Sequence, residues 1–79
     1  MNLTDEVMKV LKENRDGMTI RDVIDRIYPD IDPYDRPSRR VAVSKKLHTF
    51  LRYKMVREEI TQHPTDPEAT LSIWYWRDD

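Results

Sequence analysis

The segment VSKKLHTFLRYKMVREE, residues 43–59, decides the fold because the period of its apolar residues changes within it. Its first part places apolar side chains on one helix face at i, i+4, i+7 and i+8, namely Val43, Leu47, Phe50 and Leu51. Its last part opens the stretch VREEITQ, which favours a strand. The segment therefore predicts a helix over residues 38–54, with Ser38 as its N-cap, followed closely by a strand.

A first helix is predicted near the N-terminus. Thr4 is its expected N-cap, with Asp5 and Glu6 in the first turn, where the helix dipole favours acidic residues. Gly17, the single glycine of the chain, is expected to end this helix because it tolerates a positive φ.

A second helix is predicted by a capping box and an amphipathic pattern. Thr19 and Asp22 have the spacing of the capping box. Four apolar residues share one helix face at i, i+3, i+4 and i+7: Ile20, Val23, Ile24 and Ile27. Pro29 prevents the helix from continuing and opens the loop PDIDPYDRP, residues 29–37, which leads to the third helix.

The last third of the chain predicts a β-hairpin. VREEITQ, residues 56–62, and TLSIWYW, residues 70–76, are rich in β-branched and aromatic residues, and HPTDPEA between them is a turn with two prolines. We expect these strands to pair antiparallel, with residues 17–19 as a short third strand at the edge. The expected fold class is α+β: one domain over residues 1–79, with three helices followed by a two-stranded hairpin.

The sequence VSKKLHTFLRYKMVREE resembles the recognition helix, closing turn and first wing strand of the winged helix-turn-helix superfamily. The coarse likeness extends over about residues 4–77. It implies that the third helix enters the major groove of DNA and that the hairpin, as the wing, contacts the flanking backbone or minor groove. Two features depart from the family pattern. The wing tip carries Asp66 and Glu68 where the family commonly has cations, and the loop before the third helix is long.

Charge is distributed unevenly along the chain. The protein has 14 basic and 15 acidic residues, yet the stretch from Arg36 to Arg57 holds eight basic residues and no acidic one. Ordinary solvated helices mix both signs and gain from i, i+4 ion pairs, which this stretch forgoes. The pattern predicts a basic surface on an acidic protein, suited to a polyanion such as double-stranded DNA.

The expected DNA contacts follow from side-chain chemistry. Arg39, Arg40 and Lys45 offer donors to guanine, and the residues expected at phosphates are Arg36, Lys46, Arg52 and Lys54. At 100° per residue, the helix face opposite the apolar one is expected to carry Ala42, Lys45, Thr49 and Arg52. The small residues Ala42, Ser44 and Thr49 allow close approach to base edges. His48 is either a base or phosphate contact or an ordinary exposed histidine. The candidate DNA-binding residues are Arg36, Arg39, Arg40, Ser44, Lys45, Lys46, His48, Thr49 and Arg52.

The aromatic strand suggests a second surface. With period two, Leu71, Ile73 and Tyr75 are expected to face the core beside Val56 and Ile60, which leaves Trp74 and Trp76 outside. Two neighbouring tryptophans would form an interface for a second copy of the chain or for a protein partner. Alternatively, the first helix covers them, or an arginine stacks on the rings.

Several function classes are not expected. The chain has no cysteine, and its two histidines lack metal-ligand spacing, so we expect no metal site and no cofactor. No glycine-rich phosphate loop or nucleophile–base pair indicates an enzyme. No segment is long enough to span a membrane, and a cytoplasmic protein is expected. Two hypotheses remain: a DNA-binding regulator, and a winged-helix interaction module that binds an acidic protein partner.

Overall fold

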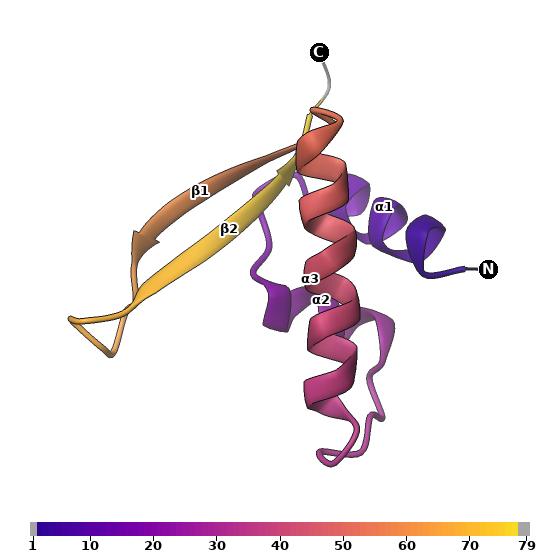
Figure 1. The fold of residues 1–79 in the computed structure, drawn as a ribbon, viewed down its shortest axis with the longest axis horizontal. Helices are drawn as coiled ribbons and strands as arrows, with labels where there is room; N and C mark the ends of the chain where they lie inside the picture. Colours follow the sequence, from indigo (N-terminus) through magenta and orange to yellow (C-terminus); the bar gives the residue numbers. More distant parts are fainter. Residues whose placement is uncertain (1, 78–79) are drawn as a thin grey trace.

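The computed structural model describes residues 2–77, which form three helices and then a hairpin. The helices are α1 (Leu3–Glu13), α2 (Ile20–Ile27) and α3 (Arg36–Arg52), and the strands are β1 (Val56–Gln62) and β2 (Thr70–Trp76). Figure 1 shows the hairpin leaving the helices at the C-terminal end of α3, with its far end standing clear of them. This order confirms the expected α+β fold, and the arrangement is consistent with a winged-helix layout.

α1 begins earlier and ends earlier than the sequence predicted. Asn2 is its N-cap, because the Asn2 side chain accepts a hydrogen bond of 2.9 Å from the backbone N–H of Asp5. Thr4 lies inside the helix, so its prediction as the cap was wrong. The helix ends at Glu13, and Gly17 instead lies in the following turn with a φ of +100°.

α2 begins as predicted. The Thr19 side chain accepts a hydrogen bond from the backbone N–H of Asp22, and the Asp22 carboxylate accepts one from the N–H of Thr19, each at 3.1 Å. This reciprocal pair satisfies two backbone donors at the helix start and confirms the capping box.

α3 starts two residues before the predicted cap. Its N-cap is Asp35, and Ser38 lies in the first turn, where its hydroxyl donates to the carbonyl of Asp35 at 2.9 Å. Pro37 is also in the first turn, where its missing N–H leaves no helical hydrogen bond unmade. The start was predicted too late because Ser38 satisfies a backbone carbonyl there rather than the N–H groups that a capping side chain serves.

The end of α3 is a Schellman motif. Lys54 adopts a left-handed φ of +60°, and its N–H donates to the carbonyl of Leu51 at 3.0 Å. The N–H of Met55 donates to the carbonyl of Phe50 at 2.9 Å. These two bonds satisfy the last helical carbonyls and turn the chain sharply into β1. The predicted passage from helix to strand near Lys54 is confirmed.

The hairpin is antiparallel, with Val56 opposite Trp76 at its base and Gln62 opposite Thr70 near its tip. Met18 adds a single bridge to Trp74 through two backbone hydrogen bonds of 2.9 and 2.7 Å. The third strand expected over residues 17–19 is therefore one bridging residue, since its neighbours belong to the turn after α1 and the cap of α2.

β2 faces the core with the opposite side from the one predicted, whereas Val56 of β1 is buried as predicted. Directly paired residues share a face, so Val56 and Ile60 lie on the same side of the hairpin as Trp74 and Trp76. Trp74 is fully buried, whereas Ile60, which was also predicted inside, is 64% exposed because it lies near the far end of β1. Val56, Trp74 and Trp76 pack on the helices. The alternation itself was right, but an indole buries more apolar area than any other side chain in β2, and the side that holds both tryptophans is therefore the one that packs inside.

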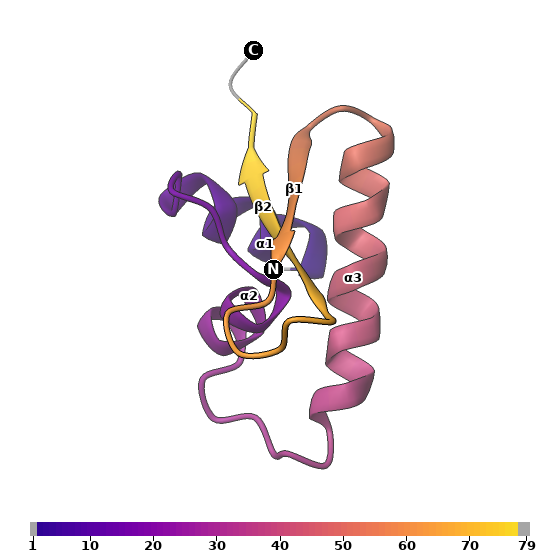
Figure 2. The same ribbon diagram turned by 90° about the vertical axis from the view of Figure 1, so that its left-hand side faces the viewer.

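The core lies where the three helices meet the base of the hairpin. Figure 2 shows α3 running along one side of the molecule, and Val43, Leu47 and Phe50 are its buried residues. Val7, Val10 and Leu11 of α1, Val23 and Ile24 of α2, Met18, Val56 and Trp74 complete the set of buried apolar side chains in the described part of the chain. This core holds α3 by one face and leaves the opposite face in solvent.

Candidate nucleic-acid interface

The outward face of α3 is defined by the buried residues on its other side. At 100° per residue, the positions opposite Val43, Leu47 and Phe50 are those of Ser38, Val41, Lys45, His48, Thr49 and Arg52. All six are exposed. Lys45, Thr49 and Arg52 lie on this face as predicted. Ala42, which was expected beside them, is half-buried, and the sequence-based interpretation missed Val41, which is 54% exposed.

Two arginines at the start of α3 are engaged by the protein itself. The Arg36 guanidinium forms an ion pair with Asp25 of α2 at 2.7 Å, and the Arg39 guanidinium lies over the Tyr28 ring at 5.0 Å from its centroid. Both were expected at DNA, as a phosphate contact and a base contact respectively. In the structure they fasten the N-terminal end of α3 to α2 and its following residue.

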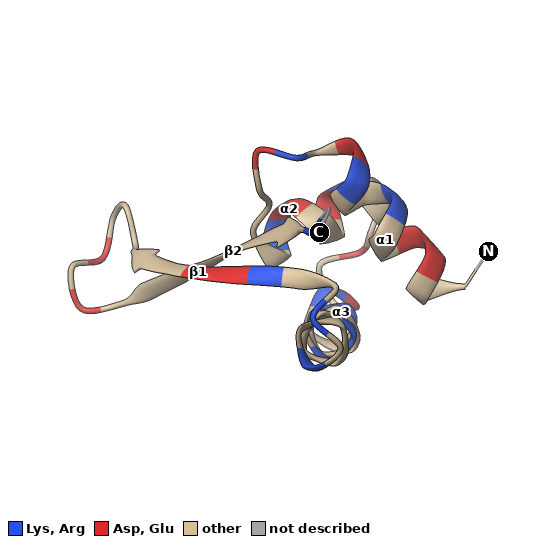
Figure 3. Ribbon diagram, turned by 90° about the horizontal axis from the view of Figure 1, so that it is seen from above, with Lys and Arg blue, Asp and Glu red and all other residues tan. Residues whose placement is uncertain are grey.

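The other cations of α3 are not neutralised. Within residues 2–77, no carboxylate lies within ion-pair distance of Arg40, Lys45, Lys46 or Arg52. α3 itself contains no acidic residue, and Figure 3 shows it banded with basic residues while the acidic residues lie on other elements. Unpaired cations grouped on one helix produce a positive potential at its surface, even though the whole protein is slightly acidic.

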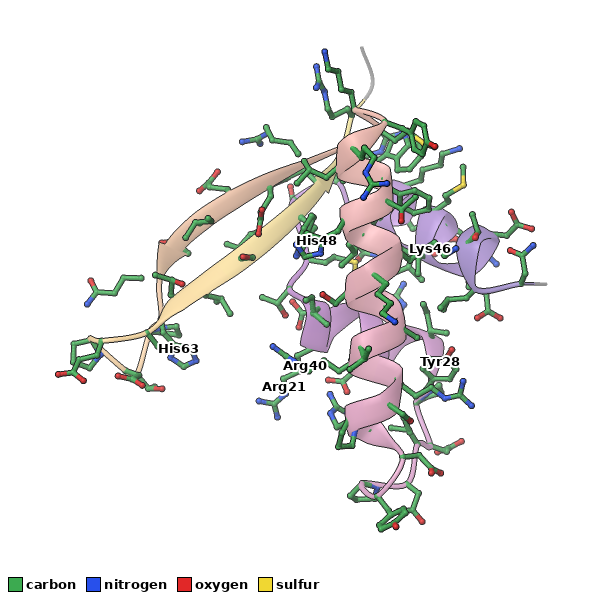
Figure 4. All side chains as sticks on the ribbon, viewed as in Figure 1. Arg21, Tyr28, Arg40, Lys46, His48 and His63 are labelled. Atoms are coloured by element: carbon green, nitrogen blue, oxygen red, sulfur yellow. The ribbon has the colours of Figure 1, made fainter. Side chains whose placement is uncertain are left out.

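These cations lie on different sides of α3. Lys45 and Arg52 are on the outward face, whereas Lys46 is half-buried on the side of α3 that faces α1, as Figure 4 shows. Arg40 lies on the other side, toward the hairpin. The structure thus brings Lys45, Thr49 and Arg52 together on one face and places Arg40 and Lys46 on opposite flanks.

A small cleft of about 160 Å³ lies beside Arg40, between the start of α2 and β2. Its lining includes a second guanidinium, from Arg21, and the hydroxyl-bearing residues Thr19, Thr70 and Ser72. Among residues 2–77, no carboxylate-bearing residue lines it. Figure 4 shows Arg21 and Arg40 next to each other in the space between α3 and the hairpin. Arg21 was not predicted as a site residue, because it is isolated from the basic stretch in sequence and joins it only through the packing of α2.

His48 connects α3 with the hairpin. Its Nδ1 lies 2.8 Å from the carbonyl oxygen of Ser44, and because a carbonyl only accepts, Nδ1 carries a proton there and Nε2 is left for other partners. The His48 ring also meets the Trp74 ring edge to face, with centroids 5.2 Å apart. Ser44 is half-buried beneath it. This geometry fixes the imidazole at one edge of the outward face.

The hairpin carries the opposite charge to α3. Beyond Arg57 it holds Glu58 and Glu59 on β1 and Asp66 and Glu68 in the turn, with no lysine or arginine before Arg77. In the turn, the Asp66 carboxylate accepts a hydrogen bond of 3.0 Å from the N–H of Glu68. The acidic tip noted in the sequence therefore stands at the far end of the hairpin, away from the cations of α3 (Figure 3).

The predicted tryptophan patch does not form. Trp74 is fully buried, and its expected exposure was wrong. Trp76 is half-buried between α1 and α3, with the Lys12 ammonium 4.9 Å from its ring centroid and the Phe50 ring meeting it edge to face at 6.2 Å. On the outer side of the strand, the Arg57 guanidinium lies 4.2 Å from the Tyr75 ring centroid. α1 therefore covers Trp76 through Lys12, as one of the alternatives expected, whereas the Trp74 ring meets His48 of α3.

The described residues present neither a metal-binding cluster nor a membrane-spanning helix. Within residues 2–77, no three histidine, cysteine, aspartate or glutamate side chains are grouped so as to hold a metal ion. None of the helices in that range has the length and apolar content needed to cross a membrane. Comparison of the chain with protein-family models, with curated proteins and with solved structures found no match.

Proposed function

We propose that this protein binds double-stranded DNA with α3 in the major groove and acts as a small transcriptional regulator. The observation that supports this most strongly is the group of cations on α3 that no carboxylate of the described chain neutralises. A DNA phosphate backbone supplies the missing negative charge, and the release of its condensed counterions favours the complex.

The shape of α3 is compatible with this role. Its 17 residues span roughly 25 Å, and a helix of about 10–12 Å in diameter fits a major groove about 12 Å wide. The core holds the helix by one face, and the opposite, outward face is exposed. Lys45 and Arg52 on the outward face are placed to reach base edges, with donors suited to guanine. Arg40 and Lys46, on opposite flanks, are placed to contact the two phosphate backbones that border the groove.

The acidic hairpin has a different part in this proposal from the wing of a typical winged-helix protein. Its carboxylates would repel phosphates, so affinity comes from α3 and from the Arg21–Arg40 cleft beside it. The second hypothesis, an interaction module for an acidic protein, uses the same cations. That hypothesis also relied on an exposed pair of tryptophans to fill a groove in the partner, and Trp74 is buried.

A salt titration with a matched pair of variants tests the proposal. Arg40→Gln with Lys46→Gln removes the two α3 cations assigned to the phosphate backbones, while Lys9→Gln with Arg26→Gln removes two exposed cations from α1 and α2. We expect the wild-type protein to bind duplex DNA with an affinity that falls steeply with salt. The α3 variant should lose about 1.8 from the magnitude of the log–log slope, at roughly 0.9 per phosphate contact, and the control should keep it.

Two results would contradict DNA binding by α3. One is the absence of any complex with duplexes from a random pool at low salt, with folding verified by circular dichroism. The other is an equal loss in the α3 variant and the control, which would indicate a response to net charge alone. Selection of bound fragments from the same pool identifies the preferred sequence.

A further inference from the structure

We propose that Val41 reads the 5-methyl group of a thymine in the major groove. The inference rests on the proposed function and adds to it a residue that determines base specificity. Val41 lies on the outward face of α3 and is 54% exposed, and no other large apolar side chain in this helix is exposed. Its neighbours one turn away on the same face, Ser38 and Lys45, are polar.

The presence of valine at this position has no evident structural reason. Val41 is not among the residues of the core or those packed against it. Valine is also a poorer helix former than alanine, because its branched side chain loses rotamer freedom in a helix. An exposed valine on a face otherwise made of hydroxyl, imidazole and cationic side chains therefore suggests an apolar contact outside the chain.

Double-stranded DNA offers few apolar groups to a helix in the major groove. Guanine, cytosine and adenine present hydrogen-bond donors and acceptors at that edge, whereas thymine also presents the C5-methyl group. A short branched aliphatic side chain at the centre of the contacting face matches that methyl group. Lysine and arginine on the same face do not, because their ends require acceptors.

The position of Val41 relative to Lys45 makes the inference more specific. Four residues along α3 correspond to about 6 Å, and stacked base pairs are about 3.4 Å apart. Lys45 offers donors for guanine O6 and N7, while Val41 meets a methyl group one or two base pairs away. The two residues together predict a thymine and a guanine at that separation in the preferred site.

Replacement of thymine by deoxyuridine tests this directly, because it removes the methyl group and leaves base pairing intact. Each thymine in a duplex selected by the wild-type protein is replaced singly, and binding is measured for wild type, Val41→Ala and Ile60→Ala. Ile60 is an exposed apolar residue on the hairpin and serves as the matched control. At one thymine, we expect the replacement to weaken wild-type binding about fourfold, the value of one buried methyl group.

In Val41→Ala the same replacement should cost less than twofold, while in Ile60→Ala the full loss should remain. Val41→Ala is expected to fold, since alanine favours the helix, and thermal unfolding verifies it. Insensitivity of wild-type binding to every replacement would overturn the inference and leave DNA binding intact, as would an undiminished loss in Val41→Ala. Failure to bind any duplex would instead reject the proposed function itself.

Discussion

Gly17 occupies a place that only glycine can fill in this structure. Its φ of +100° lies in the left-handed region, and a Cβ built on it would be 2.6 Å from Ile73 Cγ2 and 2.6 Å from Tyr75 Cε1. The residue thus allows the turn after α1 to pass close against the outer side of β2. Both the backbone conformation and the close approach disfavour a larger side chain.

Gly17→Ala should therefore destabilise the protein by about 1–3 kcal/mol, through backbone strain and displacement of Ile73 and Tyr75. Urea denaturation measures the loss. Asp16→Ala, at the exposed preceding position, is the matched control and should change stability by about 0.5 kcal/mol or less. Equal stability of Gly17→Ala and wild type would show that the turn relaxes without cost.

At the residue scale, the sequence could indicate which side chains carry charge but not which ones are already partnered. The run of cations was visible, and Lys45, Thr49 and Arg52 were correctly placed by helical period. Arg36 and Arg39 were assigned to DNA because their partners, Asp25 of α2 and Tyr28 just after it, meet them only in the folded protein. Arg21 was missed for the same reason.

The ends of the helices show how far local rules extend. α2 starts where its capping box predicted, because both hydrogen bonds of that box are made by residues three apart. α3 ends where its apolar period ends.

Other features needed more than local rules. The start of α1 was predicted at Thr4, since both Asn2 and Thr4 are good capping residues and sequence alone did not distinguish them. The face of β2 also required tertiary information, because alternation fixes which residues share a side but not which side is buried.

The capping box of α2 provides a test at the scale of one element. Thr19→Ala removes the oxygen that accepts from Asp22 N–H, and we expect a loss of about 1 kcal/mol in the free energy of unfolding. Thr19→Ser keeps the oxygen and should retain most of that stability. Chemical denaturation of both variants measures the difference. If serine proved as costly as alanine, the loss would come from packing of the threonine methyl group rather than from the cap.

On the scale of the whole molecule, the main feature is separation of charge. A group of unpaired cations lies on α3, and the distal hairpin carries carboxylates (Figure 3). The basic stretch was evident in sequence because it is continuous. The cleft lined by Arg21 and Arg40 was not, because it joins α2, α3 and β2 across the fold. For a DNA-binding protein, this separation orients the molecule, with α3 toward the polyanion and the hairpin tip away from it.

Neutralisation of the hairpin tip tests that orientation. Asp66→Asn with Glu68→Gln preserves the hydrogen-bond acceptor at residue 66 and removes two negative charges. At a distance of about 10 Å from phosphates, each charge contributes about 0.4 kcal/mol in water, so affinity should rise two- to fourfold at low salt. Salt of about 0.3 M should abolish the gain. Glu13→Gln with Asp16→Asn is the control of equal charge change and should have no such effect. A gain that survives high salt would instead indicate direct contact between the tip and DNA.

The register of the hairpin has a consequence for how the protein tolerates change. Its base is held by Val56, Trp74 and Trp76, whereas Ile60, Thr61 and Gln62 at the far end of β1 are exposed. One residue added to each strand, after Gln62 and before Thr70, would lengthen the hairpin by one pair. The pairs from Val56–Trp76 to Gln62–Thr70 would keep their register. The hairpin can therefore change in length without a change in the packing of its base on the helices. Loop grafting or attachment of a probe at residues 63–69 should leave the helices and their packing unaltered.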